Sequence, residues 1–305
     1  MSMSNVGYEQ FIRGYRLLIL PKNGGDGIDV SQLRIVFYIE KSTTETPNYS
    51  QIIIYNLAQS TIAGIKAGDK VILEAGYEKG NVGMIFSGEI VQPYVAREGS
   101  VDIALHLICQ DGDEYLTTAY TAQTLAKGST LMDAASACSS GMEKNILTPK
   151  LNKKYIRGKV LFGKSAQLMR VFAKTTKSQF FVNDGKVNIC AAEDYDGNTA
   201  VELNPMTGLI ETPNQTDDGV SAKCLLNPSL KLNSLIHINA NLIAVQQAST
   251  SQAATDVNAD GIYRIVKMTY EGDTRGQAWY CTFDAVTQSG AKPDGLVQGQ
   301  ENPWR

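Results

Sequence analysis

The sequence is poor in the residues on which most enzymes and metalloproteins depend. Only two histidines, His106 and His237, occur in 305 residues, in similar places within β-type segments. Neither belongs to an HExxH or Cys/His pattern, and no GxSxG nucleophile motif is present. Adjacent acids such as Asp113-Glu114 fall in segments typical of turns. We therefore expect a protein that is not an enzyme, with no catalytic, cofactor-binding or metal-binding residue to assign.

Cysteines are few and far apart. Their number is odd, and no two of them form a CxxC pair, which argues against both a disulfide framework and a zinc site. Most lie in apolar stretches such as LHLIC and VSAKCLL, where cysteine behaves as a small core residue. We expect all of them to be reduced, in a protein made in the cytoplasm. They are Cys109, Cys138, Cys190, Cys224 and Cys281.

Long apolar runs and a strong charge of one sign are also missing. No run approaches the roughly 20 residues that span a bilayer, and the N-terminus has no signal-peptide pattern. The net charge of −3 gives no basis for binding nucleic acid, which requires clustered cations. The densest basic stretch, KLNKKYIR at 150–157, is expected to be a solvated strand or loop. We expect neither a membrane span nor sequence-specific nucleic-acid binding.

What the sequence does contain is a regular series of short β segments. The chain is about twice the usual single-domain length, so two or three domains are expected. In the first 110 residues, segments rich in Ile, Val and Tyr are separated by turn signals such as NGGDG, TPN and EKGN, a pattern typical of a barrel or sandwich. The expected strands are Tyr15–Leu20, Leu33–Lys41, Gln51–Leu57, Lys70–Tyr77, Gly83–Val91 and Val101–Gln110.

A different pattern follows residue 110. A helix is expected between residues 128 and 141, opened by a Thr-x-x-Asp capping-box spacing, and a second one at 165–177. The tripeptide Asn183-Asp184-Gly185 then predicts a hairpin between two short strands, Gln179–Val182 and Lys186–Cys190. Together these features predict a small α+β domain.

The β pattern returns from Gly208 onward. A polar stretch, Gln246–Asp260, predicts a long loop, and the Gly-, Gln- and Pro-rich end predicts an extended tail, one of which we expect to contact a neighbouring chain. The expected strands are Gly219–Leu226, Leu235–Ala240, Gly261–Tyr270 and Gln277–Ala285. The predicted organisation is mainly β with an α+β insert: a barrel domain at 1–110, a middle domain at 111–200, a second barrel at 201–286 and a tail at 287–305.

The first and last regions look like two versions of one unit. In the first, IIIYNL, KVILEAGY, GMIFSGEIV and DIALHLIC follow one another, with the glycine turn AREGS before the last segment. In the second, KCLLNP, LIHINANL, GIYRIVKMTY and QAWYCTFDA have the same order, with EGDTRG as the turn. The distances from Asn56 to Cys109 and from Asn227 to Cys281 are nearly equal. A trimer of such chains presents six similar barrels in a ring, which matches a six-fold partner on one face and a three-fold partner on the other.

Several of these stretches resemble the baseplate hub proteins of contractile-tailed bacteriophages. They are IYNLAQSTIAGIKAGDKVILEAGY, IFSGEI, CQDGDEYL, GVSAKCLLNPSLKLNSLIHIN and DGIYRIVKMTYEGDTRGQAWYCTFDA, in this order along nearly the whole chain. The resemblance implies a homotrimer with two tube-like barrels per chain. Its pseudo-six-fold ring would lie under the hexameric tail tube and carry the trimeric spike. The implied partners are copies of itself, the tail tube protein, the spike and other baseplate proteins. The implied location is the virion's tail baseplate, assembled in the host bacterial cytoplasm, and the family has no catalytic residues to carry over.

Two alternatives remain open. A tail tube or tube-initiator protein usually has one barrel per chain, so the doubled unit disfavours it. The other alternative is a nucleotide-binding protein, because Gly158–Ser165 reads GKVLFGKS and matches the phosphate-loop motif GxxxxGK[ST]. Lys164 would then reach the phosphates and Ser165 would hold magnesium. The charged residues before the motif, its bulky Val-Leu-Phe interior and the absence of a βαβα alternation argue against this function.

Overall fold

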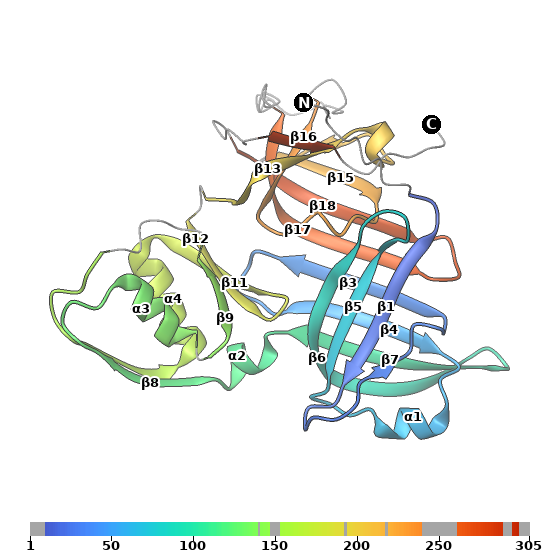
Figure 1. Ribbon diagram of the computed structural model, residues 1–305, viewed down its shortest axis with the longest axis horizontal. Helices are drawn as coiled ribbons and strands as arrows, with labels where there is room; N and C mark the ends of the chain where they lie inside the picture. The colour runs from blue at the N-terminus through green and yellow to red at the C-terminus, as the bar shows by residue number, and fades with distance from the viewer. Residues whose placement is uncertain are drawn as a thin grey trace, which may run out of the picture.

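The protein consists of two β units that lie against each other and a small α+β domain at one side (Figure 1). The computed structural model describes residues 10–139, 141–146, 153–191, 194–216, 219–239, 261–288 and 295–298. The expected fold, mainly β with an α+β insert, is confirmed. The sequence did not reveal that strands of both units belong to one 14-stranded sheet.

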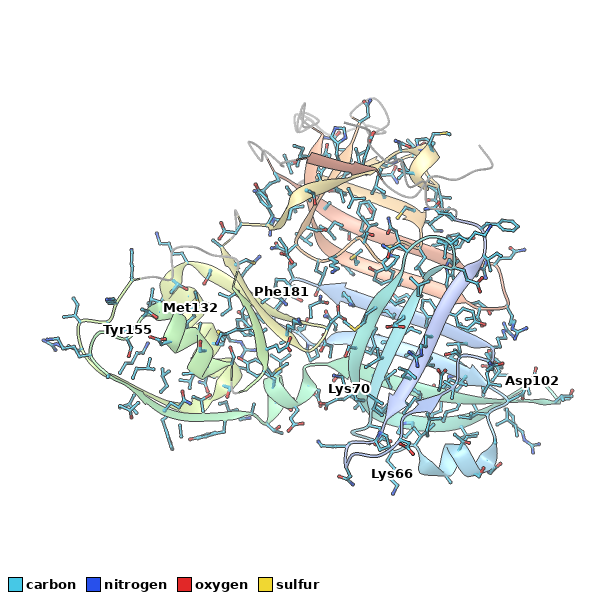
Figure 2. The ribbon with its side chains drawn as sticks, in the orientation of Figure 1. Lys66, Lys70, Asp102, Met132, Tyr155 and Phe181 are labelled. Carbon is cyan, nitrogen blue, oxygen red and sulfur yellow. The ribbon has the colours of Figure 1, made fainter. Side chains whose placement is uncertain are left out.

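The first β unit contains every strand expected from the sequence, with the sheet order β3-β4-β7-β6-β5-β1-β2. Alternate residues of β3 and β4 are buried, as the two-residue period of a strand with one core-facing side requires. The main difference is that β6 continues past Val91 to Glu98, so that the β6–β7 hairpin projects beyond the unit, with Asp102 near its end (Figures 1 and 2). The elements are β1 (Arg13–Leu20), β2 (Ile28–Asp29), β3 (Ile35–Ser42), β4 (Asn48–Tyr55), α1 (Gln59–Gly64), β5 (Lys70–Tyr77), β6 (Val82–Glu98) and β7 (Asp102–Asp111).

The middle domain has its own core, built from three helices and two small sheets. The expected capping box is present: the Thr130 side chain accepts from the Asp133 backbone, and the Asp133 carboxylate accepts from Thr130. The antiparallel pair β8–β10 was not foreseen as a sheet, because its two strands are separated in sequence by α3 and β9. The elements are α2 (Asp113–Thr117), β8 (Tyr120–Leu125), α3 (Leu131–Cys138), β9 (Glu143–Ile146), β10 (Lys159–Lys164), α4 (Ser165–Thr176), β11 (Ser178–Asn183) and β12 (Lys186–Ala191).

The second β unit begins before residue 201, because β13 starts at Asp196 and pairs in parallel with β16. Part of the expected extended tail is a strand: β19 pairs in parallel with β13. The expected loop at 246–260 and Trp304 lie outside the described residues. The elements are β13 (Asp196–Leu203), a 3-10 helix (Pro205–Thr207), β14 (Asn214–Gln215), β15 (Gly219–Leu225), β16 (Ser234–Ile238), β17 (Ile262–Asp273), β18 (Trp279–Thr287) and β19 (Gly295–Gln298).

The two β units repeat one strand arrangement. In the first, β4 pairs with β7, β7 with β6 and β6 with β5, and in the second β15 pairs with β18, β18 with β17 and β17 with β16, all antiparallel. The short strand β14 lies beside β15 as β3 lies beside β4. The long strands β6 and β17 each carry a bulge at the same point, at Val91 and at Val266. The repeat inferred from the sequence is therefore present in the topology.

The strand pairing corrects two details of the expected equivalence. Position Cys109 corresponds to Ala285, because Ile90 pairs with the former and Ile265 with the latter. The two histidines are not equivalent either, since His106 lies on β7 and His237 lies on β16, the counterpart of β5. A shared order of segments does not fix residue equivalence, because connector lengths differ between the copies.

The two units are joined edge to edge. Strand β17 of the second unit pairs with β3 of the first over Lys267–Asp273 and Val36–Ser42, and this pairing is called the seam below. An added Cβ at Gly272 would lie 2.2 Å from the Phe37 ring, so the seam requires a residue without a side chain there. The buried Trp279 donates from its indole nitrogen to the Gly76 carbonyl at 3.2 Å, a contact between the two units. The paired strands of the seam and the shared hydrophobic core join the two β units into one structural unit.

Candidate functional site

The phosphate-loop motif does not form a phosphate loop. Residues 159–164 are strand β10, whose backbone pairs antiparallel with β8. The backbone N–H of Ser165 donates to the Ala119 carbonyl, and its buried hydroxyl lies 2.7 Å from the Thr121 hydroxyl. A phosphate site needs N–H groups directed at the ligand and a hydroxyl available to magnesium. The structure provides neither at Gly158–Ser165, so the nucleotide-binding alternative is wrong at this motif.

The surroundings of His106 are a ring stack and a distant carboxylate. The His106 ring stacks on Tyr94 with centroids 4.7 Å apart, and its Nε2 lies 3.6 Å from a Glu98 carboxylate oxygen. Over the described ranges, no three His, Cys, Asp or Glu side chains gather closely enough to hold a metal ion. Among the described residues, no helix has both the length and the hydropathy needed to cross a membrane.

The seam combines backbone pairing with charged side chains. At its outer end the Arg34 guanidinium donates to both carboxylate oxygens of Asp273, at 3.2 and 2.7 Å, and this contact holds the pKa of Asp273 below its ordinary value. Further along, the Lys267 ammonium lies 2.7 Å from Glu40. Both pairs join one β unit to the other and match the observed register of the seam.

The middle domain is attached through the turn of the β11–β12 hairpin. Two adjacent residues of β11 belong to different cores: Phe180 is buried in the middle-domain core, and Phe181, labelled in Figure 2, in the core of the β units. The Asn48 side-chain amide donates to the Val182 carbonyl at 2.9 Å. At the turn itself, Asp184 has a φ of 53°, a left-handed conformation that Asp and Asn tolerate better than other side chains.

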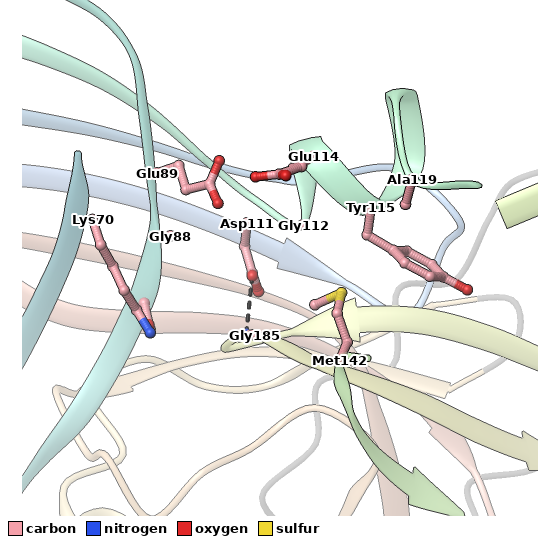
Figure 3. Close-up of a pocket in the computed structure, with 11 residues that line it drawn as sticks. Lys70, Gly88, Glu89, Asp111, Gly112, Glu114, Tyr115, Ala119, Met142 and Gly185 are labelled. Carbon is pink, nitrogen blue, oxygen red and sulfur yellow. Dashed lines mark hydrogen bonds between the residues drawn. The ribbon is translucent and has the colours of Figure 1, made fainter. Parts of the chain in front are cut away.

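Charged groups are buried around this turn. The Lys41 ammonium lies 2.7 and 2.8 Å from the Asp184 carboxylate oxygens, and the Ser87 N–H also donates to Asp184. The neighbouring Asp111 accepts from the Gly185 N–H at 3.0 Å (Figure 3). Burial, together with the charge of Asp184, raises the pKa of Asp111 to about 6. The sequence predicted the turn but not the residues that contact it, because these residues come from three other segments of the chain.

A pocket of about 400 Å³ lies beside this turn, between the first β unit and the middle domain (Figure 3). Its charged lining is mostly acidic, with Glu89, Asp111 and Glu114 against Lys70. Burial and the charge of Glu114 raise the pKa of Glu89. These carboxylates do not converge on one point as metal ligands do. The pocket is best described as part of the junction that positions the middle domain.

Known structures with a similar fold identify the class of protein to which this chain belongs. The chain is similar to a 43 kDa tail protein of prophage MuSo2 from Shewanella oneidensis and to a tail protein from Neisseria meningitidis MC58. The TM-score is 0.58 for both, the identities are 11% and 10%, and 93% of this chain and 100% of each of those chains are covered. The chain is also similar to Escherichia coli c3393, a type VI secretion component described as structurally similar to the T4 tail proteins gp27 and gp5. That TM-score is 0.53, with 10% identity, covering 85% of this chain and 75% of that one. At such low identity these matches establish the fold, which is that of phage tail proteins.

The family follows from the sequence itself. The model of the family described as "Baseplate hub gp41" matches residues 32–285, from just before β3 of the first unit into β18 of the second. The chain belongs to this baseplate hub family, and the resemblance inferred from the sequence is confirmed. It is a structural component of a phage tail baseplate. Among curated proteins, none matches this sequence.

Proposed function

We propose that this chain is the central hub of the baseplate: three copies form a ring of six similar β units that joins a hexameric tail tube to a trimeric spike. The observation that carries this proposal is the repeat of β3-β4-β7-β6 as β14-β15-β18-β17 within one sheet. One chain thus supplies two similar units side by side. Three-fold assembly then offers six similar surfaces to the tube, while the middle domains remain three in number.

The proposed partners are copies of the chain itself, the tail tube protein, the spike and other baseplate proteins. The fold neighbours support partners of this type: one is a chain of a structure described as the Francisella PdpA-VgrG complex, with a TM-score of 0.51 and 8% identity over 92% of this chain and 59% of that one. We further propose that the chain is assembled in the host cytoplasm and resides in the virion tail, working without a cofactor. A tail tube or tube-initiator role is less well supported, because one chain here already contains the doubled unit.

The test is the mass of the purified chain in solution, measured by light scattering over a range of concentrations. A trimer of about 99 kDa, three times the 33.1 kDa chain, is expected, unchanged by ATP and magnesium. Class averages of the same sample by electron microscopy should show six similar lobes with three-fold differences between alternate ones. A stable hexamer contradicts the proposal, and so does a chain that remains monomeric at the highest concentrations reached.

A further inference from the structure

A carboxylate oxygen is buried without a partner in the lining of the pocket beside the hairpin turn. Asp111 is 1% exposed, and its Oδ1 accepts from the Gly185 N–H at 3.0 Å. Its Oδ2 is buried too and has no hydrogen-bond partner among the described residues. An unpaired buried acceptor costs free energy, and more so when it is charged, so it calls for a specific explanation. Because Asp111 lines the pocket, a donor bound there is placed to supply the missing partner (Figure 3).

Two further carboxylates line the pocket, and the three differ in depth. The Glu114 side chain is 59% exposed, Glu89 is half-buried and Asp111 is fully buried. Figure 3 shows the Glu89 and Glu114 carboxylates turned toward each other, with Asp111 beside them. Glu114 has a cationic partner in the exposed Lys22, at 3.3 Å. In the described part of the chain, neither Glu89 nor Asp111 has a cation within ion-pair distance.

The lining therefore carries more negative than positive charge. Its one cation, Lys70, is exposed and can extend into solvent. The pKa of Glu89 and that of Asp111 are both raised, first by burial and second by the charge of a neighbouring carboxylate. A cation bound in the pocket would lower both pKa values, and the same interaction would favour its binding.

The opposite wall of the pocket is apolar and belongs to the middle domain. Tyr115, Ala119 and Met142 form it. The Tyr115 hydroxyl already donates to the Cys138 carbonyl, so this wall offers mainly ring and methyl surface. The carboxylates across from it do not gather as metal ligands do. A cation on a hydrocarbon stem fits both walls, because its N–H donors reach acceptors that lie apart while its methylene groups pack on apolar atoms.

We propose that this pocket binds an alkylguanidinium or alkylammonium group, with its cation between Glu89 and Asp111. The stem lies against Tyr115 and Met142. Two sources offer this chemistry: the arginine or lysine side chain of a partner protein, and a free diamine or guanidine compound. The pocket volume of about 400 Å³ accommodates either. The inference goes beyond the hub assignment, because it does not depend on how many copies form the ring.

A cation bound here would also hold the middle domain against the first β unit. Glu89 lies on β6 and Asp111 ends β7, whereas Tyr115 lies on α2 of the middle domain. Occupation of the pocket connects these elements. Amide exchange in α2 and at the turn of the β11–β12 hairpin should therefore slow when the cation is added.

Calorimetry on the full chain at low salt and about pH 7.5, where both carboxylates are ionised, tests the site. Agmatine is the probe for a free compound, and N-acetylarginine amide is the probe for a side chain. The neutral isostere N-acetylcitrulline amide is the control. We expect saturable binding of one cation per chain and no binding of the citrulline compound. Stronger binding of agmatine identifies a small molecule as the natural ligand, and stronger binding of the arginine amide identifies a partner's side chain.

Substitutions then locate the binding. Glu89→Gln and Asp111→Asn should each weaken it by about ten-fold or more, because a hydrogen bond to a charged group is lost. Lys70→Gln should strengthen it by about two- to five-fold, because a competing cation is removed. A damaged fold cannot produce this gain. The matched control is Glu74→Gln, which lies on β5 like Lys70 but outside the lining and should bind as wild type does.

Three results overturn the proposal. They are the absence of binding of both cations up to about 10 mM, equal binding of the citrulline and arginine compounds, and binding that neither E89Q nor D111N weakens. The last would mean that cations bind elsewhere on the acidic surface. The hub assignment is tested separately: a trimeric chain that binds neither cation loses the site and keeps the hub, whereas a monomeric chain that binds them keeps the site.

Discussion

The Lys41 ammonium and the Asp184 carboxylate, 2.7 Å apart, form an ion pair whose side chains are only 5% and 16% exposed. Lys41 lies on β3, the strand that also forms the seam, and Asp184 is the turn of the middle-domain hairpin. This contact therefore links the first β unit, at the seam, with the middle domain. Because the pair is shielded from water, removal of one partner leaves a buried charge without compensation.

Replacement of Lys41 by methionine should therefore lower the free energy of unfolding by roughly 3 kcal/mol, since breaking a buried pair typically costs 3–5 kcal/mol. Urea unfolding at pH 7 measures the change. The double variant K41M/D184N should recover part of the loss, because no uncompensated carboxylate remains and asparagine tolerates the left-handed turn. As a surface control, Lys22→Met breaks an exposed pair with Glu114 and should change stability by less than about 1 kcal/mol. Equal effects of K41M and K22M would contradict the role assigned to Lys41.

Asp111 gives the fold a specific pH dependence. Its pKa is about 6 in the folded chain and 3.8 ordinarily, so between these values the folded state binds more protons than the unfolded one. Stability contributed by this group is thus greatest below about pH 4 and is lost as the pH rises towards 6. In Asp111→Asn no carboxyl group titrates at this position, so this loss of stability with rising pH should be absent. The change in unfolding free energy from pH 4.5 to pH 7 should differ between wild type and variant by about 2 kcal/mol, measured by urea titration at both pH values. Identical pH profiles of wild type and variant would show that burial does not raise the pKa of Asp111 in the folded chain.

Local signals in the sequence predicted local structure well. The turn Asn183-Asp184-Gly185, the capping box at Thr130 and the strands of the first unit appear as expected. The order of segments also revealed the repeat. What the sequence did not reveal depends on residues far apart: the seam between β3 and β17, and Lys41 beside Asp184. An edge strand and a strand that pairs with another unit have the same two-residue pattern, so the pattern does not distinguish them.

The phosphate-loop motif shows that a local sequence signal can occur without the structural context that gives it a function. Lys164→Ala should leave the free energy of unfolding within about 0.5 kcal/mol of wild type, because this exposed side chain lies at the surface end of β10. Nucleotide binding is the sharper readout: calorimetry with ATP and magnesium should give no heat of binding for either protein. Binding that disappears in K164A would reverse this conclusion.

The cysteines should be chemically silent in the folded chain. All five are buried and free, and burial raises the pKa of Cys109 to about 12 and that of Cys138 to about 11. Because the thiolate is the reactive form, thiol reagents at pH 8 should react slowly with the native chain and with all five thiols after denaturation. A count of reactive thiols by absorbance measures this. One thiol that reacts rapidly in the native state would mark a local opening near it.

The seam makes a last prediction, through a glycine. In Gly272→Ala the new Cβ would meet the buried Phe37 ring of β3, which would have to shift, so the free energy of unfolding should fall by about 1–3 kcal/mol. The matched control is Gly64→Ala at the end of α1, where nothing lies within 4 Å and alanine is the better helix former. That control should be neutral or slightly stabilising. If the seam holds the two β units together, G272A should also speed amide exchange in β3 and β17 more than in β5, which lies far from the seam in the sheet order. Uniform exchange throughout the sheet would mean that the two units do not depend on this contact.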